Sequence, residues 1–344
     1  MLNIESKDIL SFDLHGLEKL MVSFGYKAFH GQQVYAWIYR RGITDYDKMT
    51  DLQKDLRKKL FDNYPEMLPK IIKEVRGSGD QSTTKFLLEA EDKQRFEVVN
   101  IPTQDRNTLC VSCQVGCVYN CKFCATGSMG FKRNLTYEEI VGSYFAVQNR
   151  IKERITNIVF MGMGEPLINL KNVMQAWNIF TEPDGIGISR RKVTISTVGI
   201  PDQIRVLALE PYPPKLVFSI CSPHEEIRRK LLLKAGKYSL EEIHKSLMYY
   251  SKKSRNRITI ALLIAKGFNN TIEDAKALHS WIRNLPVKIN ILRYNETEDG
   301  LSRADENDVE KVANELHRLG RTVILRQSRG SDINAACGQL AAKY

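Results

Sequence analysis

Residues 108–124 decide the fold, and they read TLCVSCQVGCVYNCKFC. The beginning, 108–112, is a short apolar run of the kind that forms a buried strand, and it leads into C-x3-C-x2-C at Cys117, Cys121 and Cys124. Three thiolates at this spacing on one loop can hold one face of an iron–sulfur cube. They leave one iron without a protein ligand, and such an iron can bind a small molecule.

Five of the seven cysteines lie within fifteen residues, while Cys221 and Cys337 are isolated. The odd number and the tight clustering argue against a disulfide scaffold and for metal or redox chemistry in a reducing compartment. A structural zinc site usually has four ligands in paired C-x2-C knuckles, and no second knuckle is present. Zinc completed by Cys110 or Cys113 is therefore the alternative to the iron–sulfur cluster.

Downstream of this loop the chain alternates between short apolar runs and longer stretches of helical periodicity. Repeated βα units indicate a parallel sheet or barrel, in which the loops after the strand C-termini hold the active site. The predicted strands are 108–112, 157–161, 192–197, 216–220, 258–264, 289–292 and 323–326. The predicted helices are 137–150, 170–180, 202–209, 240–252, 272–284 and 306–319.

Upstream of residue 107 the sequence lacks this βα alternation, and the chain is therefore predicted to have three parts. Residues 1–70 favour small helices, with the clearest periodicity near 30–39 and 51–61. Residues 71–106 favour a β-meander of strands at 71–75, 84–88 and 96–100, with turns at 77–80 and 91–92. The remainder, 107–344, is the predicted catalytic α/β part.

The chain is basic, with 51 Lys and Arg against 40 Asp and Glu, a formal net charge of +11. This balance suits a polyanionic partner such as RNA, DNA or an anionic surface, although an ordinary solvated surface is an alternative. A hydrophobic content of 43% and a charged content of 26% exclude long disorder and fibrous classes. The absence of an apolar run long enough to span a membrane, and of a signal-peptide pattern, predicts a cytoplasmic protein. Basic residues gather at 190–192, 228–230, 252–257, Arg326 and Arg329.

Several motifs together resemble the RlmN/Cfr family of RNA adenine methyltransferases, within the radical S-adenosylmethionine enzymes. These motifs are the cluster loop itself, LCVSCQVGC at 109–117, GFKRNL at 130–135, FMGMGEPL at 160–167 and SRGSDINAACGQL at 328–340. The resemblance runs from about residue 25 to the C-terminus. It implies a partial (β/α)6 radical-SAM barrel with a small helical N-terminal domain, 1–70, that binds RNA, and a β-meander bridge, 71–106.

The resemblance also implies a [4Fe-4S] cluster on Cys117, Cys121 and Cys124, and two S-adenosylmethionine molecules per turnover. Glycines in the turn at 162–164 let the backbone approach a ligand, and a carboxylate beside them can accept bonds from the cofactor ammonium. Without the resemblance, Glu165 is equally an exposed acid of a tight turn. The cofactor-binding residues implied by the family are Gly164, Glu165, Ser196, Ser219, Ile220, Cys221 and Asn295.

In the family, one cofactor first methylates the cysteine that matches Cys337, and a second yields a 5′-deoxyadenosyl radical that takes hydrogen from this methyl group. The carbon radical adds to adenine, and the resulting covalent enzyme–RNA adduct is resolved when the cysteine matching Cys110 attacks the Cys337 sulfur. Glu97 matches the general base, with a surface carboxylate as its alternative. Cys113 stands where the family usually has serine and is expected to be a bystander.

The sequence departs from the family at SICSP, 219–223, where Cys221 replaces the customary histidine, and at LLKAG, 232–236, where a Met-Pro-Ile-Asn-like stretch is usual. Main-chain contacts to the cofactor do not depend on that side chain, so we expect cofactor binding to persist. The alternative to an enzyme is a degenerate paralogue that binds RNA and an iron–sulfur cluster but has no catalytic activity. The presence of both Cys110 and Cys337 favours an enzyme, since a binding protein needs neither.

The predicted activity is methylation of adenosine C2 in 23S rRNA, with tRNA as a second substrate. EPLIN at 165–169 and NTLC at 107–110 look more like the RlmN branch, whereas RYN at 293–295 looks more like the C8-methylating Cfr branch, which is the rival. Beyond RNA, the expected partners are an electron donor and a thiol reductant, with no membrane. The chain is expected to be a monomer.

Overall fold

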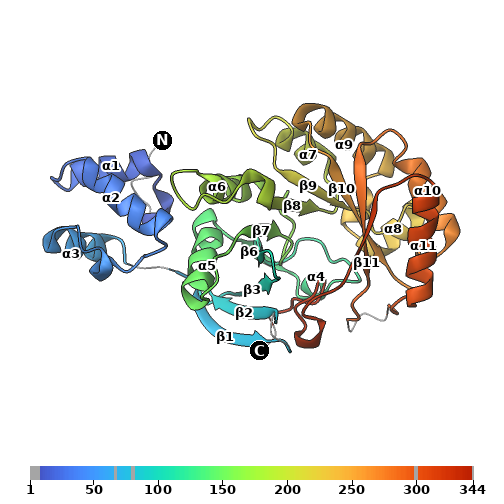
Figure 1. The fold of residues 1–344 in the computed structure, drawn as a ribbon, viewed down its shortest axis with the longest axis horizontal. Helices are drawn as coiled ribbons and strands as arrows, with labels where there is room; N and C mark the ends of the chain where they lie inside the picture. The colour runs from blue at the N-terminus through green and yellow to red at the C-terminus, as the bar shows by residue number, and fades with distance from the viewer. Residues whose placement is uncertain (1–7, 66–67, 79–81, 298–300, 343–344) are drawn as a thin grey trace.

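A computed structural model describes residues 8–65, 68–78, 82–297 and 301–342. Part of the turn expected at 77–80 lies outside these residues, as do short pieces of the predicted parts 1–70 and 107–344. The described chain forms one large sheet covered by helices, with a group of small helices at one end (Figure 1).

The sheet has the strand order β1-β2-β3-β4-β7-β8-β9-β10-β11-β12. Strands β1 to β4 pair antiparallel, which makes the expected meander, and from β4 onward neighbouring strands pair parallel. The antiparallel part contains β1 (Lys70–Arg76), β2 (Thr84–Glu89) and β3 (Arg95–Pro102). The parallel part contains β4 (Asn107–Val111), β7 (Asn157–Phe160), β8 (Val193–Thr197), β9 (Lys215–Ser219), β10 (Ile258–Ile264), β11 (Val287–Arg293) and β12 (Val323–Arg326).

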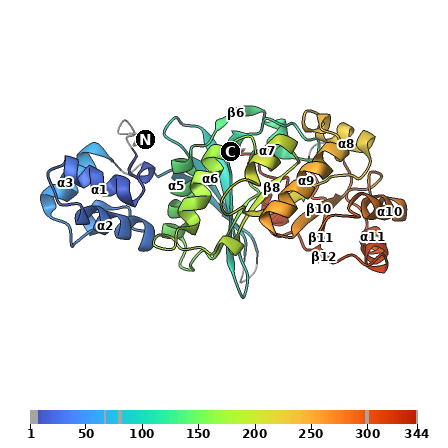
Figure 2. The same cartoon turned by 90° about the horizontal axis from the view of Figure 1, so that it is seen from above.

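Helices follow the parallel strands and cover the outer face of the curved sheet (Figure 2). Three of them begin with a capping box, in which a Thr or Ser side chain and an acidic side chain three residues later satisfy the free amides of the first turn. These boxes start at Thr136, Ser239 and Thr271. The helices are α5 (Tyr137–Arg150), α6 (Leu170–Thr181), α7 (Pro201–Leu207), α8 (Glu225–Leu232), α9 (Leu240–Ser254), α10 (Ile272–Trp281) and α11 (Glu306–Arg318).

The N-terminal helices are α1 (Leu14–Ser23), α2 (Phe29–Tyr35) and α3 (Lys54–Asn63), and α2 runs on into a π-helical turn at Ala36–Arg40. They lie at the opposite end of the molecule from α10 and α11 (Figure 1). Their own apolar residues close a small core, and the members that are fully shielded from solvent are Leu17, Met21, Val34, Ile38, Leu56 and Leu60.

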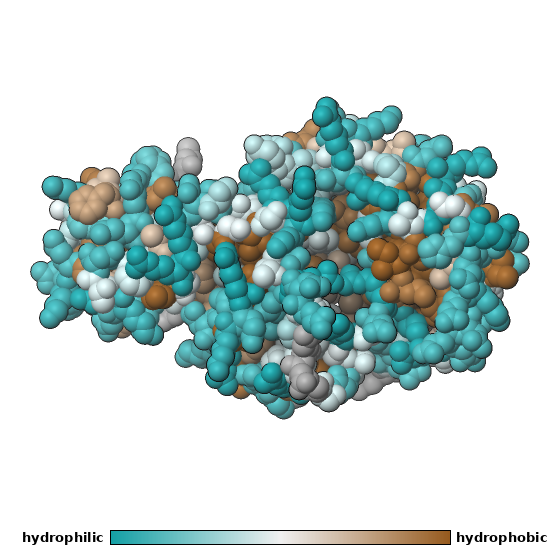
Figure 3. All heavy atoms as spheres, viewed as in Figure 1, coloured by the Kyte–Doolittle hydropathy of each residue, from teal (hydrophilic) through white to brown (hydrophobic). Residues whose placement is uncertain are grey.

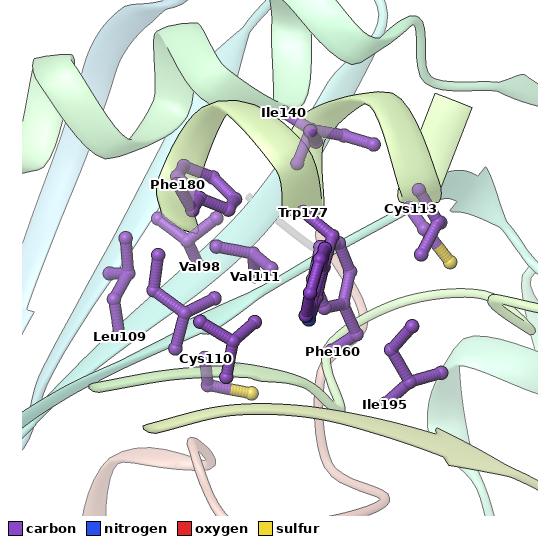
Figure 4. Packing of buried hydrophobic residues seen from close by; sticks show 14 of the residues in the cluster. Val98, Leu109, Cys110, Val111, Cys113, Ile140, Phe160, Trp177, Phe180 and Ile195 are labelled. Carbon is purple, nitrogen blue, oxygen red and sulfur yellow. The ribbon is translucent and has the colours of Figure 1, made fainter. Parts of the chain in front are cut away.

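The main core lies between the sheet and the helices α5 and α6. Trp177 and Phe180 of α6 pack over Val111 of β4 and Phe160 of β7, all with at most 2% of their surface exposed (Figure 4). Burial of this kind contributes roughly 1.5–3 kcal/mol per large apolar side chain, so it holds the strand ends rigidly beneath the helices. Cys110 precedes Val111 on β4, and its side chain therefore points to the opposite face of the sheet, away from α6 (Figure 4).

The α/β fold class and the partial barrel expected from the sequence are confirmed, and all of the strands and helices predicted after residue 107 are present with ends that shift by a few residues. Four of the described α-helices and strands after residue 107 were not predicted: helix α4 (Ala125–Ser128), helix α8, and the hairpin of β5 (Gln114–Gly116) and β6 (Phe131–Asn134). Helix α8 is rich in charged residues and has no side-chain N-cap bond. The other three are only three or four residues long, too short to show an apolar period.

The expectation that residues 228–230 form an exposed basic group is wrong for Arg228. Its side chain is fully buried, whereas Arg229 and Lys230 beside it are exposed. The other basic groups are on the surface, and the face in Figure 3 is covered largely by hydrophilic residues, with hydrophobic ones gathered in its hollows. In the part of the chain that the structure describes, no helix combines the length and the apolar character that a bilayer crossing requires.

Candidate active site

The cluster loop connects β5 to α4 (Ala125–Ser128) and is folded tightly on itself. The Cys117 amide donates to the carbonyl of Gly130 at 3.1 Å, and the Cys124 amide donates to that of Cys121 at 3.1 Å. Cys121 is buried, and Cys117 and Cys124 are half-buried. The loop therefore presents its three thiols from a fixed backbone.

These thiols lie close enough to influence one another. Burial raises the pKa of Cys117 to about 12, with a smaller contribution from the neighbouring Cys124 and against the lowering effect of the Tyr119 amide. Burial raises the pKa of Cys121 well above its usual range, and Cys221, Cys124 and Cys117 add to the effect. Thiols held protonated in this way ionise when they bind iron, because a metal ligand must be the thiolate.

The same residues do not form a site for a single metal ion. Within 8–65, 68–78, 82–297 and 301–342, no three His, Cys, Asp or Glu side chains converge on one ion. A cube differs from a single ion because each cysteine binds a different iron, so the thiols need not meet at one point. Nor do Cys110 and Cys113 complete a zinc site: Cys110 lies near Cys337, and the Cys113 thiol contacts the carbonyl of Met163 at 3.6 Å. Three clustered soft thiols on one loop fit an iron–sulfur cube.

Gly164 and Glu165 follow β7 in a turn that packs against Gln114. Gly164 has φ +98°, and a Cβ there would come within 2.5 Å of the Gln114 Cβ, so only glycine fits. Glu165 is 4% exposed, which removes the alternative of an exposed acid. Its carboxylate accepts the amides of Leu167 at 3.1 Å and Val198 at 3.0 Å, and it thereby joins the ends of β7 and β8.

Burial raises the pKa of Glu165 to about 7, against the opposing effect of the Val198 and Leu167 amides. The carboxylate is thus already engaged with the backbone of this chain. Two further polar groups, Ser196 of β8 and Ser219 of β9, face each other with their Oγ atoms 3.5 Å apart. All of these groups lie at the C-terminal ends of neighbouring parallel strands, as the sequence predicted.

Cys221 adopts a left-handed backbone, with φ +62°, just after β9. The Asn269 side chain donates to the carbonyls of both Cys221 and Leu263, which fixes this unusual conformation between β9 and β10. The Ile220 amide donates to the carbonyl of Ala261 at 3.1 Å. These bonds hold the backbone of this segment although the customary histidine is absent.

Cys110 on β4 and Cys337 near the C-terminus are brought together although 227 positions separate them in the printed sequence. Burial raises the pKa of Cys110, and the neighbouring Cys337 raises it further. Desolvation raises the pKa of Cys337, while Arg326 lowers it and Cys124 raises it. Cys337 is therefore near both the resolving candidate Cys110 and the cluster cysteine Cys124.

The peptide that carries Cys337 is held at Cys337 itself and on its C-terminal side. The Ala125 amide donates to the carbonyl of Gly338 at 2.7 Å, and Thr126 Oγ1 donates to that of Leu340 at 2.6 Å. The buried Asn295 side chain donates to the carbonyl of Cys337 itself at 3.3 Å. Helix α4, which directly follows the cluster loop, thus positions the Cys337 peptide beside that loop.

Glu97 on β3 is 1% exposed, so the alternative of a surface carboxylate is wrong. It forms an ion pair of 3.1 Å with Lys85 on β2, and its Oε2 accepts the amide of Ala341 at 2.9 Å. Lys85 also donates to the carbonyl of Asn334 at 3.1 Å. The pair therefore anchors the Cys337 peptide from the side of the meander.

The sequence reasoning missed Lys85, Asn269 and Arg228. Lys85 was detectable, because the hairpin register pairs Leu87 with Glu97 and leaves Lys85 as a diagonal neighbour of Glu97 on the same face. Asn269 and Arg228 carried no such signal, since their partners are backbone carbonyls of distant segments.

Comparison with known proteins agrees with this geometry. Residues 7–64 match the model of the ribosomal RNA large subunit methyltransferase N-terminal domain, and residues 111–282 match that of the radical SAM superfamily. A probable dual-specificity RNA methyltransferase RlmN from Dictyoglomus turgidum is 38% identical over 341 residues, which covers 98% of this chain and 97% of that protein. The chain belongs to the RlmN family. A relative of the same name from Christiangramia forsetii is 39% identical over 342 residues, with 98% and 97% covered.

The structure of a radical SAM methyltransferase from Sphaerobacter thermophilus superposes on that of this RlmN-family protein with a TM-score of 0.94. The two are 34% identical, and the match covers 98% of this chain and 99% of the other. The resemblance predicted from the motifs is confirmed, and the RlmN-family chain is an enzyme of the radical SAM methyltransferases.

Proposed function

We propose that this enzyme methylates C2 of adenosine in 23S rRNA, with tRNA as a second substrate, through a methylated Cys337. The observation that carries the proposal is the meeting of Cys110 and Cys337 beside the cluster loop. A protein that only binds RNA through a cluster has no use for two further cysteines that approach each other there. The relatives' name, dual-specificity RNA methyltransferase, supports two RNA substrates.

Cys117, Cys121 and Cys124 are the residues that would hold a [4Fe-4S] cluster. S-adenosylmethionine would bind over the strand ends at Gly164, Glu165, Ser196, Ser219, Ile220, Cys221 and Asn295. Two cofactor molecules per turnover would supply, respectively, the methyl group of Cys337 and the abstraction of hydrogen from it. Because the Glu165 carboxylate is already bonded to the amides of Leu167 and Val198, we assign it the shaping of the cofactor turn as well as direct contact.

The chain's own residues carry the remaining steps. Once Cys337 is joined through its methylene carbon to C2, the adduct still holds one unpaired electron. Glu97 would accept the C2 proton while this electron passes to the oxidised cluster. Cys110 then attacks the Cys337 sulfur: an S–S bond forms, the S–C bond to the RNA breaks, and the carbon leaves with the bonding pair and takes up a proton. The disulfide that remains needs two electrons from a thiol reductant, and the cluster needs a separate electron donor.

An adenine inside a helix cannot reach a pocket at the strand ends, so the substrate base must be unstacked. We assign the N-terminal part, 1–70, to RNA binding, 71–106 to a bridge and 107–344 to catalysis. The exposed basic groups Arg190, Arg191 and Lys192 and the pair Arg326 and Arg329 would contact phosphates. An enzyme with these substrates works in the cytoplasm.

Nucleoside mass spectrometry of rRNA and tRNA from a strain that lacks this gene tests the proposal. We expect 2-methyladenosine to disappear and to return on complementation with the wild type, but not with Cys337→Ala. Unchanged 2-methyladenosine, or loss of 8-methyladenosine in its place, would overturn the assignment to C2. The second outcome would agree with the Cfr-like RYN sequence at 293–295.

A further inference from the structure

Arg228 is a buried, positively charged residue that has no role in the proposed reaction. It lies in the middle of α8 with no solvent-exposed surface. Burial lowers the pKa of its guanidinium, which shows how poorly the site solvates a positive charge. Within the described ranges, no carboxylate forms an ion pair with it, although burying an uncompensated charge costs several kcal/mol.

The guanidinium bridges the ends of two strands that lead into the site. Its Nη1 donates to the carbonyl of Ile220 at 3.3 Å, and its Nη2 donates to the carbonyl of Val198 at 2.6 Å. Its central carbon lies 5.6 Å from the centre of the Phe218 ring. In the described structure, the buried Nε has no hydrogen-bond partner.

One of the groups that act on its charge belongs to the cluster loop. Cys221, Glu225 and Cys121 each raise the pKa of Arg228, in that order of strength. The Lys122 amide donates to the carbonyl of Leu231 at 2.9 Å, which fastens the cluster loop to the same helix, one turn beyond Arg228. Arg228 and the cluster ligand Cys121 are therefore held at a fixed separation.

A cube bound by three thiolates carries negative charge and gains one more when it is reduced. Such an anion supplies the compensation that the buried guanidinium lacks in the protein alone. We infer that Arg228 is a positioning residue for the cluster: it braces the ends of β8 and β9 and places one buried positive charge beside Cys121 that favours the reduced cluster. This inference rests on the proposed [4Fe-4S] cluster at Cys117, Cys121 and Cys124.

The test compares Arg228→Gln, which keeps N–H donors without the charge, with Arg228→Lys, which keeps the charge on a shorter stem. Arg257→Gln is the matched control, because Arg257 also donates to a backbone carbonyl, that of Val287, but at the start of β10, away from the strand ends that form the site. Reconstituted proteins are first assayed for iron and sulfide. Their clusters are then titrated by electron paramagnetic resonance against a low-potential chemical reductant.

At the midpoint potential of the wild type, we expect the ratio of reduced to oxidised cluster to fall severalfold in Arg228→Gln. The ratio should stay within about twofold in Arg228→Lys and Arg257→Gln, since the charge near the cluster is kept. An unchanged ratio in Arg228→Gln with a full cluster would overturn the inference. A wild type that takes up no iron would overturn the proposed function instead.

If Arg228→Gln does not fold, the test uses the pH dependence of the cluster midpoint potential in Arg228→Lys. A buried lysine loses its proton at moderately alkaline pH, whereas arginine does not. Between about pH 7 and about pH 9.5 the midpoint of Arg228→Lys should shift to more negative potentials than that of the wild type. In the reconstituted proteins Cys121 is bound to iron and does not titrate. Both proteins share the other groups that face this position, Cys221 and Glu225, so their effects cancel in the comparison. Parallel pH profiles of the two proteins would refute a role for the charge.

Discussion

Replacing Lys85 by Met isolates the buried ion pair that anchors the Cys337 peptide. Only 4% of the Lys85 side chain and 1% of that of Glu97 are exposed, and their charged atoms are 3.1 Å apart. Removing one partner of such a pair leaves a buried carboxylate without its counter-charge, which costs about 3–5 kcal/mol. The bond from Lys85 to the carbonyl of Asn334 is lost at the same time.

We therefore expect Lys85→Met to lower the free energy of unfolding by about 3 kcal/mol or more, measured by urea unfolding followed by circular dichroism. For a chain of 344 residues, an unfolding entropy of about 2.1 cal/mol/K per residue makes this a fall in the apparent Tm of roughly 4 °C or more. The double variant Lys85→Met/Glu97→Gln should recover most of the loss, because the amide still accepts the bond from Ala341 and no charge remains buried.

Lys93→Met is the control, since Lys93 forms an ion pair with Glu89 on the surface, where the lysine side chain is 73% exposed. Solvent screens such pairs, and this variant should unfold almost as the wild type does. The reasoning is refuted if Lys85→Met and Lys93→Met behave alike, or if the double variant is no more stable than Lys85→Met.

Three further predictions concern the site. Cys110→Ala should accumulate protein crosslinked to RNA on a denaturing gel, whereas Cys337→Ala should give neither crosslink nor methylated RNA; freely migrating RNA with an otherwise active Cys110→Ala would contradict the resolving role. Gly164→Ala should destabilise the protein by more than about 1 kcal/mol in urea unfolding, because φ is +98° and the added Cβ meets Gln114, and Gly130→Ala, also at positive φ but with open space around it, should lose less. The pKa of Glu165 is raised by burial from 4.5 to about 7, so the folded, cluster-free protein binds an extra proton between these values and its stability should fall by about 3 kcal/mol as pH rises through this window. Glu165→Gln should remove that part of the pH dependence. Equal slopes of unfolding free energy against pH in the variant and the wild type would contradict the assignment of this effect to Glu165.

The architecture was predictable from local signals. Repeated βα alternation after residue 107 predicted the parallel sheet. The helices predicted to start at 137 and 240 do start there in the structure, directly after the capping residues Thr136 and Ser239. Helix α8 was not predicted because most of its residues are charged, and its buried face consists of Arg228 together with Leu231 and Leu232.

The site was predictable only in part, for a physical reason. The cysteines and the turn at Gly164 are residue types whose chemistry or backbone conformation is visible in a sequence. The burial of Glu97 and Arg228 depends on which distant segments close over them, and a charged residue in a sequence is by default assigned to the surface. The pairing of Cys110 with Cys337 came from the family resemblance alone, since nothing local joins a strand near residue 110 to a peptide near residue 337.

The double anchoring of the Cys337 peptide has a consequence for timing. With Lys85 and Glu97 on one side and Ala125 and Thr126 on the other, the main chain around Cys337 does not have to rearrange for its sulfur to face first one reaction partner and then another. Rotation about the bonds of an exposed side chain takes picoseconds to nanoseconds, whereas a typical enzyme turns over in about a millisecond to a second. Reorientation of this sulfur is thus too fast to limit turnover, and the slow events must be sought in the arrival and release of the nucleic acid or in the bond-breaking itself.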